Sequence, residues 1–234
     1  MTQRENTALQ TAARWWYGAI AAIILGSLII QIALLFTGGA DANSGESGDS
    51  LSIGIRLWRL FSFFTIESNI VVMIVCLLLV ANPLRGGPWW EVARLNALLA
   101  ITITGLVYAI ILAPMVHLTG WALVATIGFH YVSPWAMVLG WLLFGPRHRF
   151  TARTIAGAFI LPVLWLIYIF IQGQFSLWYP YPFLDVTKIG LGSPLVNAVL
   201  VLALAAVLAL VYLLIDAKVP SLLRDEASEP ALAK

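Results

Sequence analysis

Apolar residues occur along this chain in long runs, without the short alternating patterns of soluble helices and strands. A helix needs about 20 mainly apolar residues to cross the hydrocarbon core of a bilayer. Six stretches meet this requirement, and we predict a spanning helix in each: 15–36, 57–81, 96–115, 121–144, 155–171 and 194–215. The connections are too short for a second folded domain. The pattern therefore predicts one all-α integral membrane domain, residues 1–234, folded as a single six-helix bundle.

Three polar segments lie between or after these runs. Residues 37–52 are rich in Gly, Ser, Asp and Asn and predict a flexible outer loop. Residues 172–192 include Trp-Tyr-Pro-Tyr-Pro-Phe at 178–183, where alternating prolines predict a stiff, non-helical backbone. This outer loop is either an interfacial anchor or a lid over a pocket. The tail, 217–234, is polar and rich in Ala and Glu, and we predict that it is disordered.

Composition and charge placement support a membrane protein and argue against a nucleic-acid partner. The chain is 61% hydrophobic and 10% charged, whereas soluble domains are about 45–50% apolar and 25% charged. The formal charge of +2 results from basic residues that cluster beside span ends. Ten lie on one side: Arg4, Arg14, Arg85, Arg94, Arg147, Arg149, Arg153, Lys218, Arg224 and Lys234. Only Arg56, Arg59 and Lys188 lie on the other. Since cytoplasmic loops carry the excess of Lys and Arg, we predict a cell-membrane protein with both termini in the cytoplasm.

The second predicted span contains a run of polar side chains, Thr65-Ile66-Glu67-Ser68-Asn69. An acidic residue at the bilayer centre costs about 2.5–3.5 kcal/mol on insertion scales, so such groups usually face a protein interior or a wet cavity. Helical spacing brings Thr65 and Ser68/Asn69 to one face, while Glu67 points elsewhere. The run predicts a polar pocket inside the bundle.

One of the three histidines, His130, lies inside a span. It shares a helical stripe with Thr126, Ser133 and Met137, at spacings of three and four. Pro134 cannot donate to the His130 carbonyl, so we expect the helix to be kinked or opened beside the imidazole. A buried, hydrogen-bonded structural histidine is the competing interpretation.

Depth in the membrane relates His130 to Thr65. Both spans run in the same direction, and a rise of 1.5 Å per residue puts Thr65 roughly 12 Å and His130 roughly 13–14 Å below the same face. A threonine hydroxyl becomes a useful nucleophile when a neighbouring base accepts its proton, and imidazole is the usual partner. The two residues are therefore a candidate nucleophile and base.

The residues around this pair resemble a known family. Phe-Phe-Thr-Ile-Glu-Ser-Asn at 63–69, Phe-His-Tyr-Val-Ser-Pro at 129–134 and Tyr-Pro-Tyr-Pro-Phe-Leu-Asp at 179–185, in this order on six spans, resemble bacterial members of the androgen-induced/androgen-dependent transmembrane hydrolase family. Animal members are six-span threonine hydrolases that cleave fatty acid esters of hydroxy fatty acids with one Thr and one His. The resemblance extends roughly over 15–215. It implies Thr65 as nucleophile, His130 as base and a lipid-like ester as substrate.

Other polar residues have two or more interpretations. Glu67 is either protonated, paired with His130 to hold its tautomer, or open to a wet cleft. Asn69 either donates to an oxyanion or bridges helices, and Ser68 and Ser133 are candidates for the same pocket. Arg59, with Arg56 near it, either holds a fatty acid carboxylate or reaches to lipid phosphate.

We expect membrane lipids and a lipid-like substrate or ligand as partners, and leave the oligomeric state open. The rival to a hydrolase is a non-enzymatic carrier or receptor that binds a small lipid in the same pocket. A haem or quinone protein is weaker, because bis-histidine ligation needs a second intramembrane histidine. Cys76 is the only cysteine, which excludes an internal disulfide and a cysteine-based metal site. We therefore expect neither cofactor nor metal.

Overall fold

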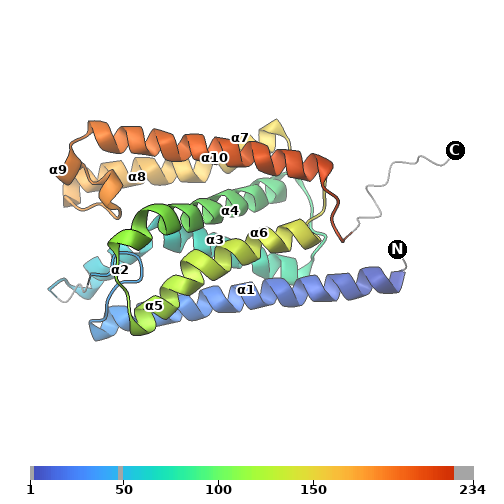
Figure 1. Cartoon of the computed structure of the whole chain (residues 1–234), viewed down its shortest axis with the longest axis horizontal. Coiled ribbons are helices and arrows are strands. Elements are labelled where there is room, and N and C mark those ends of the chain that lie inside the picture. Colours follow the sequence, from blue (N-terminus) through green and yellow to red (C-terminus); the bar gives the residue numbers. More distant parts are fainter. Residues whose placement is uncertain (1–2, 47–49, 224–234) are drawn as a thin grey trace.

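The computed structural model describes residues 3–46 and 50–223. These residues are helical throughout the bundle and include no β-strand element. Within these described ranges, six helical segments are long and apolar enough to cross a membrane: Gln3–Thr37, Phe64–Ala81, Pro88–Met115, Gly120–Phe144, Ala152–Ser176 and Gly192–Lys218. They pack side by side along one axis (Figure 1). The predicted all-α, six-span bundle is confirmed.

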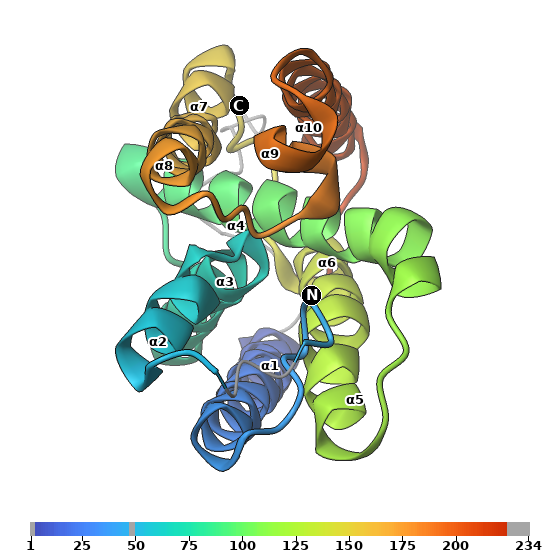
Figure 2. The same ribbon diagram turned by 90° about the vertical axis from the view of Figure 1, so that its left-hand side faces the viewer.

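Helix α4 (Pro88–Val107) forms the centre of the bundle. Figure 2, which looks along the bundle, has α4 between α3 (Phe64–Ala81) and α6 (Ser133–Phe144) on one side and α8 (Ile160–Ser176) and α10 (Gly192–Lys218) on the other. In its most apolar window, 72% of the Pro88–Met115 span is buried, compared with 22% of α10. Helix α4 is therefore shielded by protein, whereas α10 presents most of its surface outward.

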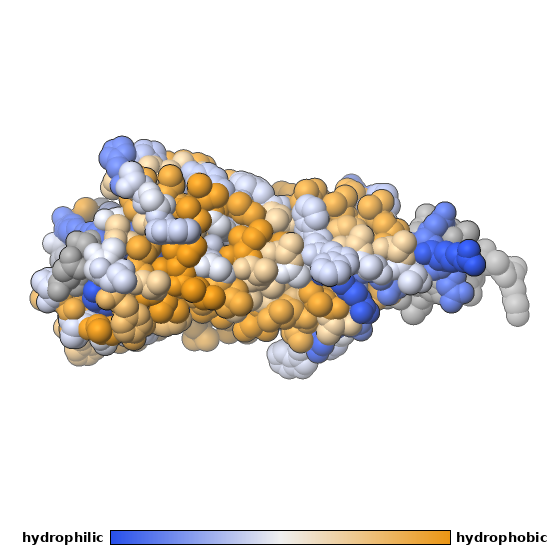
Figure 3. Space-filling view, turned by 90° about the horizontal axis from the view of Figure 1, so that it is seen from below, coloured by the Kyte–Doolittle hydropathy of each residue, from blue (hydrophilic) through white to orange (hydrophobic). Residues whose placement is uncertain are grey.

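The first and last spans begin and end at the same end of the bundle. The N-terminus of α1 (Gln3–Thr37) and the C-terminus of α10 both lie on the right in Figure 1. We call this the terminal end. The opposite, loop end carries residues 38–46 and 50–52, α2 (Ile53–Ser62) and α9 (Val186–Ile189). Figure 3 shows apolar side chains covering the middle of one face and hydrophilic ones gathered toward the ends, as a bilayer requires.

Helix boundaries differ from the predicted spans where helices extend beyond the apolar core or break within it. Helix α1 begins at Gln3, and α4 at Pro88, because a helix can continue into the headgroup layer after hydropathy falls. The second predicted span is two helices, α2 and α3, separated at Phe63. The fifth consists of α7 (Ala152–Ala158) and α8, separated at Phe159.

The predicted disorder after residue 216 is wrong for 217–223. Helix α10 continues to Lys218, and Leu222 N–H then donates to the Leu143 carbonyl at 2.8 Å. Leu223 is buried. These apolar residues pack against the terminal end of α6, which composition averaged over the whole tail does not predict. The rest of the predicted tail, 224–234, lies outside the described residues.

The loop that follows α1 folds back onto the bundle. Gln31 binds it at two points, donating from Nε2 to Asp41 Oδ2 and accepting at Oε1 from Ala42 N–H, both at 2.8 Å. Thr126 of α5 (Gly120–Ile127) donates to the Ala42 carbonyl at 2.6 Å. Residues 41–43 thus connect α1 to α5, while 47–49 lie outside the described residues.

Candidate functional site

A helix break positions Thr65. Phe63 has extended backbone angles, φ −70° and ψ 127°, so α2 ends at Ser62 and α3 starts anew at Phe64. Thr65 thereby occupies the first turn of α3, where backbone N–H groups have no acceptor within the helix. The positive end of the helix dipole also lies here. The break gives a threonine in mid-bundle the local environment of a helix N-terminus.

The candidate base, His130, lies on a second irregular segment. His130 belongs to η3 (Gly128–Val132), a single π-helical turn between α5 and α6 that ends two residues before Pro134. Such turns widen a helix and are frequent at functional sites. This is the opening expected beside the imidazole. Thr65 Oγ1 lies 3.2 Å from His130 Nε2, and both side chains are almost wholly buried.

A backbone carbonyl sets the tautomer of His130. Nδ1 lies 3.2 Å from the Thr126 carbonyl oxygen, which can only accept a hydrogen bond. Nδ1 therefore carries the proton, and the Nε2 lone pair faces the Thr65 hydroxyl. Tyr108, on a second π-helical turn, η1 (Tyr108–Leu112), stacks on the face of the imidazole. The candidate nucleophile Thr65, the candidate base His130 and the Thr126 carbonyl that orients it are thus arranged in series, a geometry that suits covalent catalysis by an activated hydroxyl.

The neighbouring polar residues hold the backbone around the pair. Asn69 Nδ2 donates to the carbonyls of Thr65 at 2.8 Å and Phe129 at 3.2 Å, and its Oδ1 accepts from Ser133 at 2.6 Å. Ser68 lies within hydrogen-bonding distance of the Thr65 carbonyl and of Thr104 Oγ1. Because both amide hydrogens of Asn69 are engaged, this residue bridges helices and has no free donor for an oxyanion.

Two charged candidates lie away from the pair. Glu67 is half-buried and, within residues 3–46 and 50–223, makes no hydrogen bond or ion pair. It does not hold the His130 tautomer, since the Thr126 carbonyl occupies that position. Arg59 lies at the loop end, with its guanidinium 4.9 Å above the ring centroid of Trp178.

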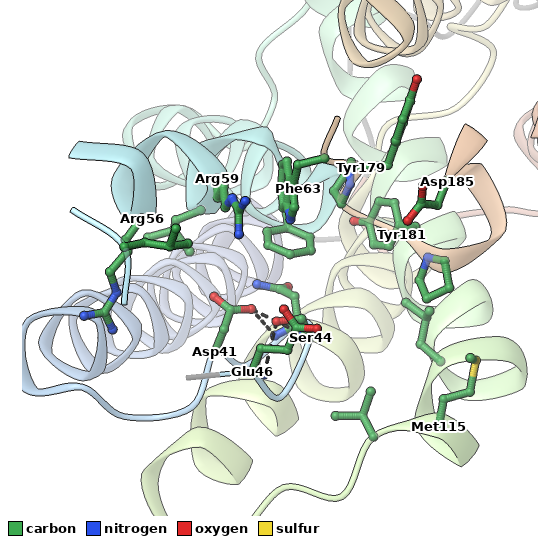
Figure 4. Close-up of a pocket in the computed structure, with 18 of the residues that line it drawn as sticks. Asp41, Ser44, Glu46, Arg56, Arg59, Phe63, Met115, Tyr179, Tyr181 and Asp185 are labelled. Atoms are coloured by element: carbon green, nitrogen blue, oxygen red, sulfur yellow. Dashed lines mark hydrogen bonds between the residues drawn. The ribbon is translucent and has the colours of Figure 1, made fainter. Parts of the chain in front are cut away.

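Two cavities approach the site from different sides. The outer pocket has a volume of about 320 Å³ and opens at the loop end (Figure 4). Charged side chains surround it: Asp41, Glu46, Arg56, Arg59, Asp185 and Lys188. The inner pocket, about 60 Å³, is lined mainly by apolar side chains, which come from α3, α4, α8, α10 and the 181–184 segment. Thr65 lines the inner pocket, and Tyr181 lines both.

Tyr181 and Tyr108 are site residues that sequence reasoning did not assign. The Tyr181 hydroxyl accepts from Thr65 N–H at 3.2 Å and lies 3.3 Å from Thr65 Oγ1. Tyr181 lies in the aromatic–proline segment, which the sequence allows to be a lid over a pocket. The sequence does not indicate which residue Tyr181 contacts. Nothing in the local sequence around Tyr108 distinguishes it from other aromatic residues of the apolar runs. Its π-helical turn could not be inferred from hydropathy.

Within the described part of the chain, no three His, Cys, Asp or Glu side chains group closely enough to hold a metal ion. No family model, curated protein or solved structure matches this chain.

Proposed function

We propose that this protein is an intramembrane hydrolase of lipid-like esters, with Thr65 as nucleophile and His130 as general base. The observation that carries the proposal is the 3.2 Å approach of Thr65 Oγ1 to the unprotonated Nε2 of His130. We propose further that the chain is a bacterial member of the androgen-induced/androgen-dependent transmembrane threonine hydrolase family. The three motifs that carry this resemblance contribute Thr65, His130 and Tyr181, which lie in one chain of contacts.

The reaction proceeds through an acyl-enzyme. Thr65 Oγ1 bonds to the ester carbonyl carbon, the π electron pair moves to the carbonyl oxygen, and the hydroxyl proton passes to His130 Nε2. The bond to the alcohol oxygen then breaks, and His130 returns the proton to the leaving alcohol. A water molecule attacks the acyl-enzyme in the same way, with His130 accepting its proton, and releases the acid and free Thr65.

The two cavities divide the substrate between them. The inner pocket receives the acyl chain, because its walls are apolar and it adjoins Thr65. The outer pocket receives the alcohol portion, because its charged rim suits a polar group. The inner pocket has room for only a short length of chain, so a longer chain extends between α8 and α10 toward lipid. The partners are accordingly membrane lipids and a lipid-like ester.

We propose a cell-membrane location with the terminal end in the cytoplasm. The loops that connect α3 to α4 and α6 to α7 carry Arg85, Arg147 and Arg149 at this end. Positive charge in short connections marks the cytoplasmic side. Thr65 and His130 then belong to the half of the membrane that faces away from the cytoplasm.

The test uses purified protein in detergent or vesicles, p-nitrophenyl acyl esters and a fluorophosphonate probe. We expect wild type to hydrolyse the ester and to be phosphonylated on Thr65, identified by mass spectrometry. Thr65→Ala and His130→Ala should each reduce turnover about 10³-fold or more, since a nucleophile and its base act as a unit. Full turnover in either folded variant removes the assigned role.

Carriage or reception of a small lipid is the second candidate. It is favoured by the outer pocket, which is the larger cavity and contains neither Thr65 nor His130. In that case purified protein binds a fluorescent fatty acid without hydrolysing esters, and the probe labels no threonine. Labelling of Thr65 with turnover supports the hydrolase instead.

A further inference from the structure

The aromatic–proline segment places a tyrosine hydroxyl against the candidate nucleophile. Helix α8 ends at Ser176 and is capped by Leu177, which has φ 53°. The chain then folds into the bundle so that Tyr179, Tyr181 and Leu184 are buried. Tyr181 is separated from Thr65 by 116 positions in sequence, and its Oη lies 3.3 Å from Thr65 Oγ1. The segment therefore contributes directly to the site, beyond covering it.

Three aromatic rings fix the position of the Tyr181 hydroxyl. Phe183 stacks on Tyr181 with centroids 5.4 Å apart and planes inclined by 13°. Phe63, the residue at the helix break, packs edge-on at 5.6 Å, and Trp165 packs at 6.0 Å. Ring contacts of this kind each contribute beyond the area that they bury. The phenol oxygen is therefore held in place before any substrate arrives.

The hydrogen bonds of Tyr181 leave its own proton available. Thr65 N–H donates to Oη at 3.2 Å, so the phenol oxygen acts as acceptor for an otherwise unpaired N–H of the helix. The Thr65 hydroxyl donates to His130, which leaves the Tyr181 O–H to donate to Thr65 Oγ1. Burial raises the pKa of Tyr181 to about 12, and the phenol keeps its proton at neutral pH.

We propose that the Tyr181 hydroxyl is a third catalytic group, which donates a hydrogen bond to the carbonyl oxygen of the ester as negative charge develops on it. This rests on the proposed hydrolase function. During attack, Thr65 Oγ1 becomes bonded to carbon and accepts hydrogen bonds poorly, so the Tyr181 O–H rotates to the neighbouring oxyanion. Tyr181 keeps its proton throughout. Thr65 N–H remains on Oη and strengthens the phenol as a donor, because linked hydrogen bonds polarise one another.

The cavities support the same role. Tyr181 lines both the outer and the inner pocket, and Thr65 lies beside it in the inner one. An ester with its alcohol portion in the outer pocket and its acyl chain in the inner pocket must have its carbonyl group at the junction, where Tyr181 lies. Oxyanion donors act at this point, about 3 Å from both the nucleophile and the reacting oxygen.

The experiment compares wild type with Tyr181→Phe, which removes the hydroxyl and keeps the ring. Loss of one oxyanion donor lowers kcat about 10²–10³-fold, and we expect this fall for p-nitrophenyl butyrate with KM unchanged. A trifluoromethyl ketone forms a tetrahedral adduct with an active-site hydroxyl. The negatively charged oxygen of this adduct mimics the oxyanion that forms during ester hydrolysis. Its inhibition constant should rise in Tyr181→Phe by a similar factor.

Tyr212→Phe is the matched control. Tyr212 is also buried, and its hydroxyl lies 2.7 Å from a threonine hydroxyl, that of Thr102, in the other half of the bundle. This variant loses an equivalent hydrogen bond, and its kcat should remain that of wild type. A structural role for Tyr181 predicts instead that kcat stays within a few-fold while KM or the melting temperature changes.

A fluorinated tyrosine at position 181 provides a second variant that retains the ring and the hydroxyl. Its phenol ionises at lower pH, and the proposal predicts that activity at high pH is lost earlier than in wild type. An unchanged high-pH limb overturns the proposal.

The outcomes separate this proposal from the hydrolase proposal on which it rests. If wild type hydrolyses the ester and Tyr181→Phe has the same kcat, Tyr181 has no catalytic role and the hydrolase proposal stands. If wild type neither turns over nor is labelled, both fail.

Discussion

The ring of Tyr108 stacks on the imidazole of His130, with centroids 3.8 Å apart and planes inclined by 21°. Each residue lies on a π-helical turn, η1 for Tyr108 and η3 for His130, within a span that is mainly α-helical. The turn η1 follows α4, and η3 lies between α5 and α6, so this ring contact joins the two spans at their widened turns. The stacked ring and the Thr126 carbonyl together fix both the plane and the tautomer of the imidazole.

Replacing Tyr108 with Leu should reduce turnover, because the imidazole loses the flat surface that restricts its rotation. An aromatic pair contributes about 0.5–1.5 kcal/mol beyond area burial, which corresponds to roughly a 2- to 12-fold fall in kcat. Tyr108→Phe keeps the ring and should retain wild-type kcat. Steady-state kinetics on a p-nitrophenyl ester measures both variants. Equal activity of Leu and Phe at this position would show that stacking does not matter.

Filling the inner pocket should shorten the acyl chains that the protein accepts. Ala205 is buried in its wall on α10, and Ala205→Phe occupies the space beside Thr65. Each lost methylene contact is equivalent to about 1–3 kcal/mol, so kcat/KM should fall 10-fold or more for long chains and little for acetyl esters. The next residue, Ala206, is exposed. Ala206→Phe is the control and should leave the chain-length profile unchanged, whereas a uniform loss across chain lengths in Ala205→Phe would contradict an acyl pocket.

Gly128 permits the close approach of α1 to the histidine-bearing turn. A Cβ added at Gly128 would collide with Ser27 Oγ of α1. Overpacking of a well-packed interior costs about 1–3 kcal/mol, so Gly128→Ala should lower the melting temperature of the purified protein. Gly26, also on α1, has open space at its Cβ position. Gly26→Ala should be neutral or slightly stabilising, because Ala favours a helix by about 1 kcal/mol over Gly. Equal melting temperatures for the two variants would contradict this packing.

The loop after α1 should give the protein a pH-dependent stability through Asp41. Burial raises the pKa of this carboxyl above its ordinary value, despite hydrogen bonds from the backbone N–H groups of Asn43 and Ser44. The folded state therefore binds a proton more tightly than the unfolded state. The resulting stabilisation is fully present below the unfolded pKa of about 3.9 and is lost as pH rises through the raised folded pKa.

Asp41→Asn cannot titrate, and the difference in melting temperature between wild type and this variant isolates the contribution of Asp41. We expect wild type to gain relative to the variant at acidic pH and to lose this gain as pH approaches neutrality. Thermal unfolding in detergent at several pH values measures the difference. A difference that grows toward neutral pH would have the opposite sign and would exclude a raised pKa at Asp41.

The apolar runs and the positions of basic residues determined the number of spans and the return of both termini to one end. Both properties depend on local composition, because insertion of a segment into lipid depends on its own apolar content. Six long apolar runs therefore predict six spans, and an even number of spans returns the two termini to the same side. The pairing of Thr65 with His130 could also be predicted from the sequence. Helical rise alone gives the depth of each residue in the membrane, and the polar run at 65–69 needs a protein interior to face.

Only the tertiary structure decided how the Thr65 and His130 side chains are arranged relative to each other. The helix break at Phe63, the π-helical turns at Tyr108 and His130, and the placement of Tyr181 all depend on contacts between segments far apart in sequence. Hydropathy is insensitive to them, because a broken helix and a straight one have the same apolar content. Asn69 illustrates the same point: its residue type allowed either an oxyanion donor or a helix bridge, and only the packing of α3 against η3 gave both of its amide hydrogens acceptors on the backbone.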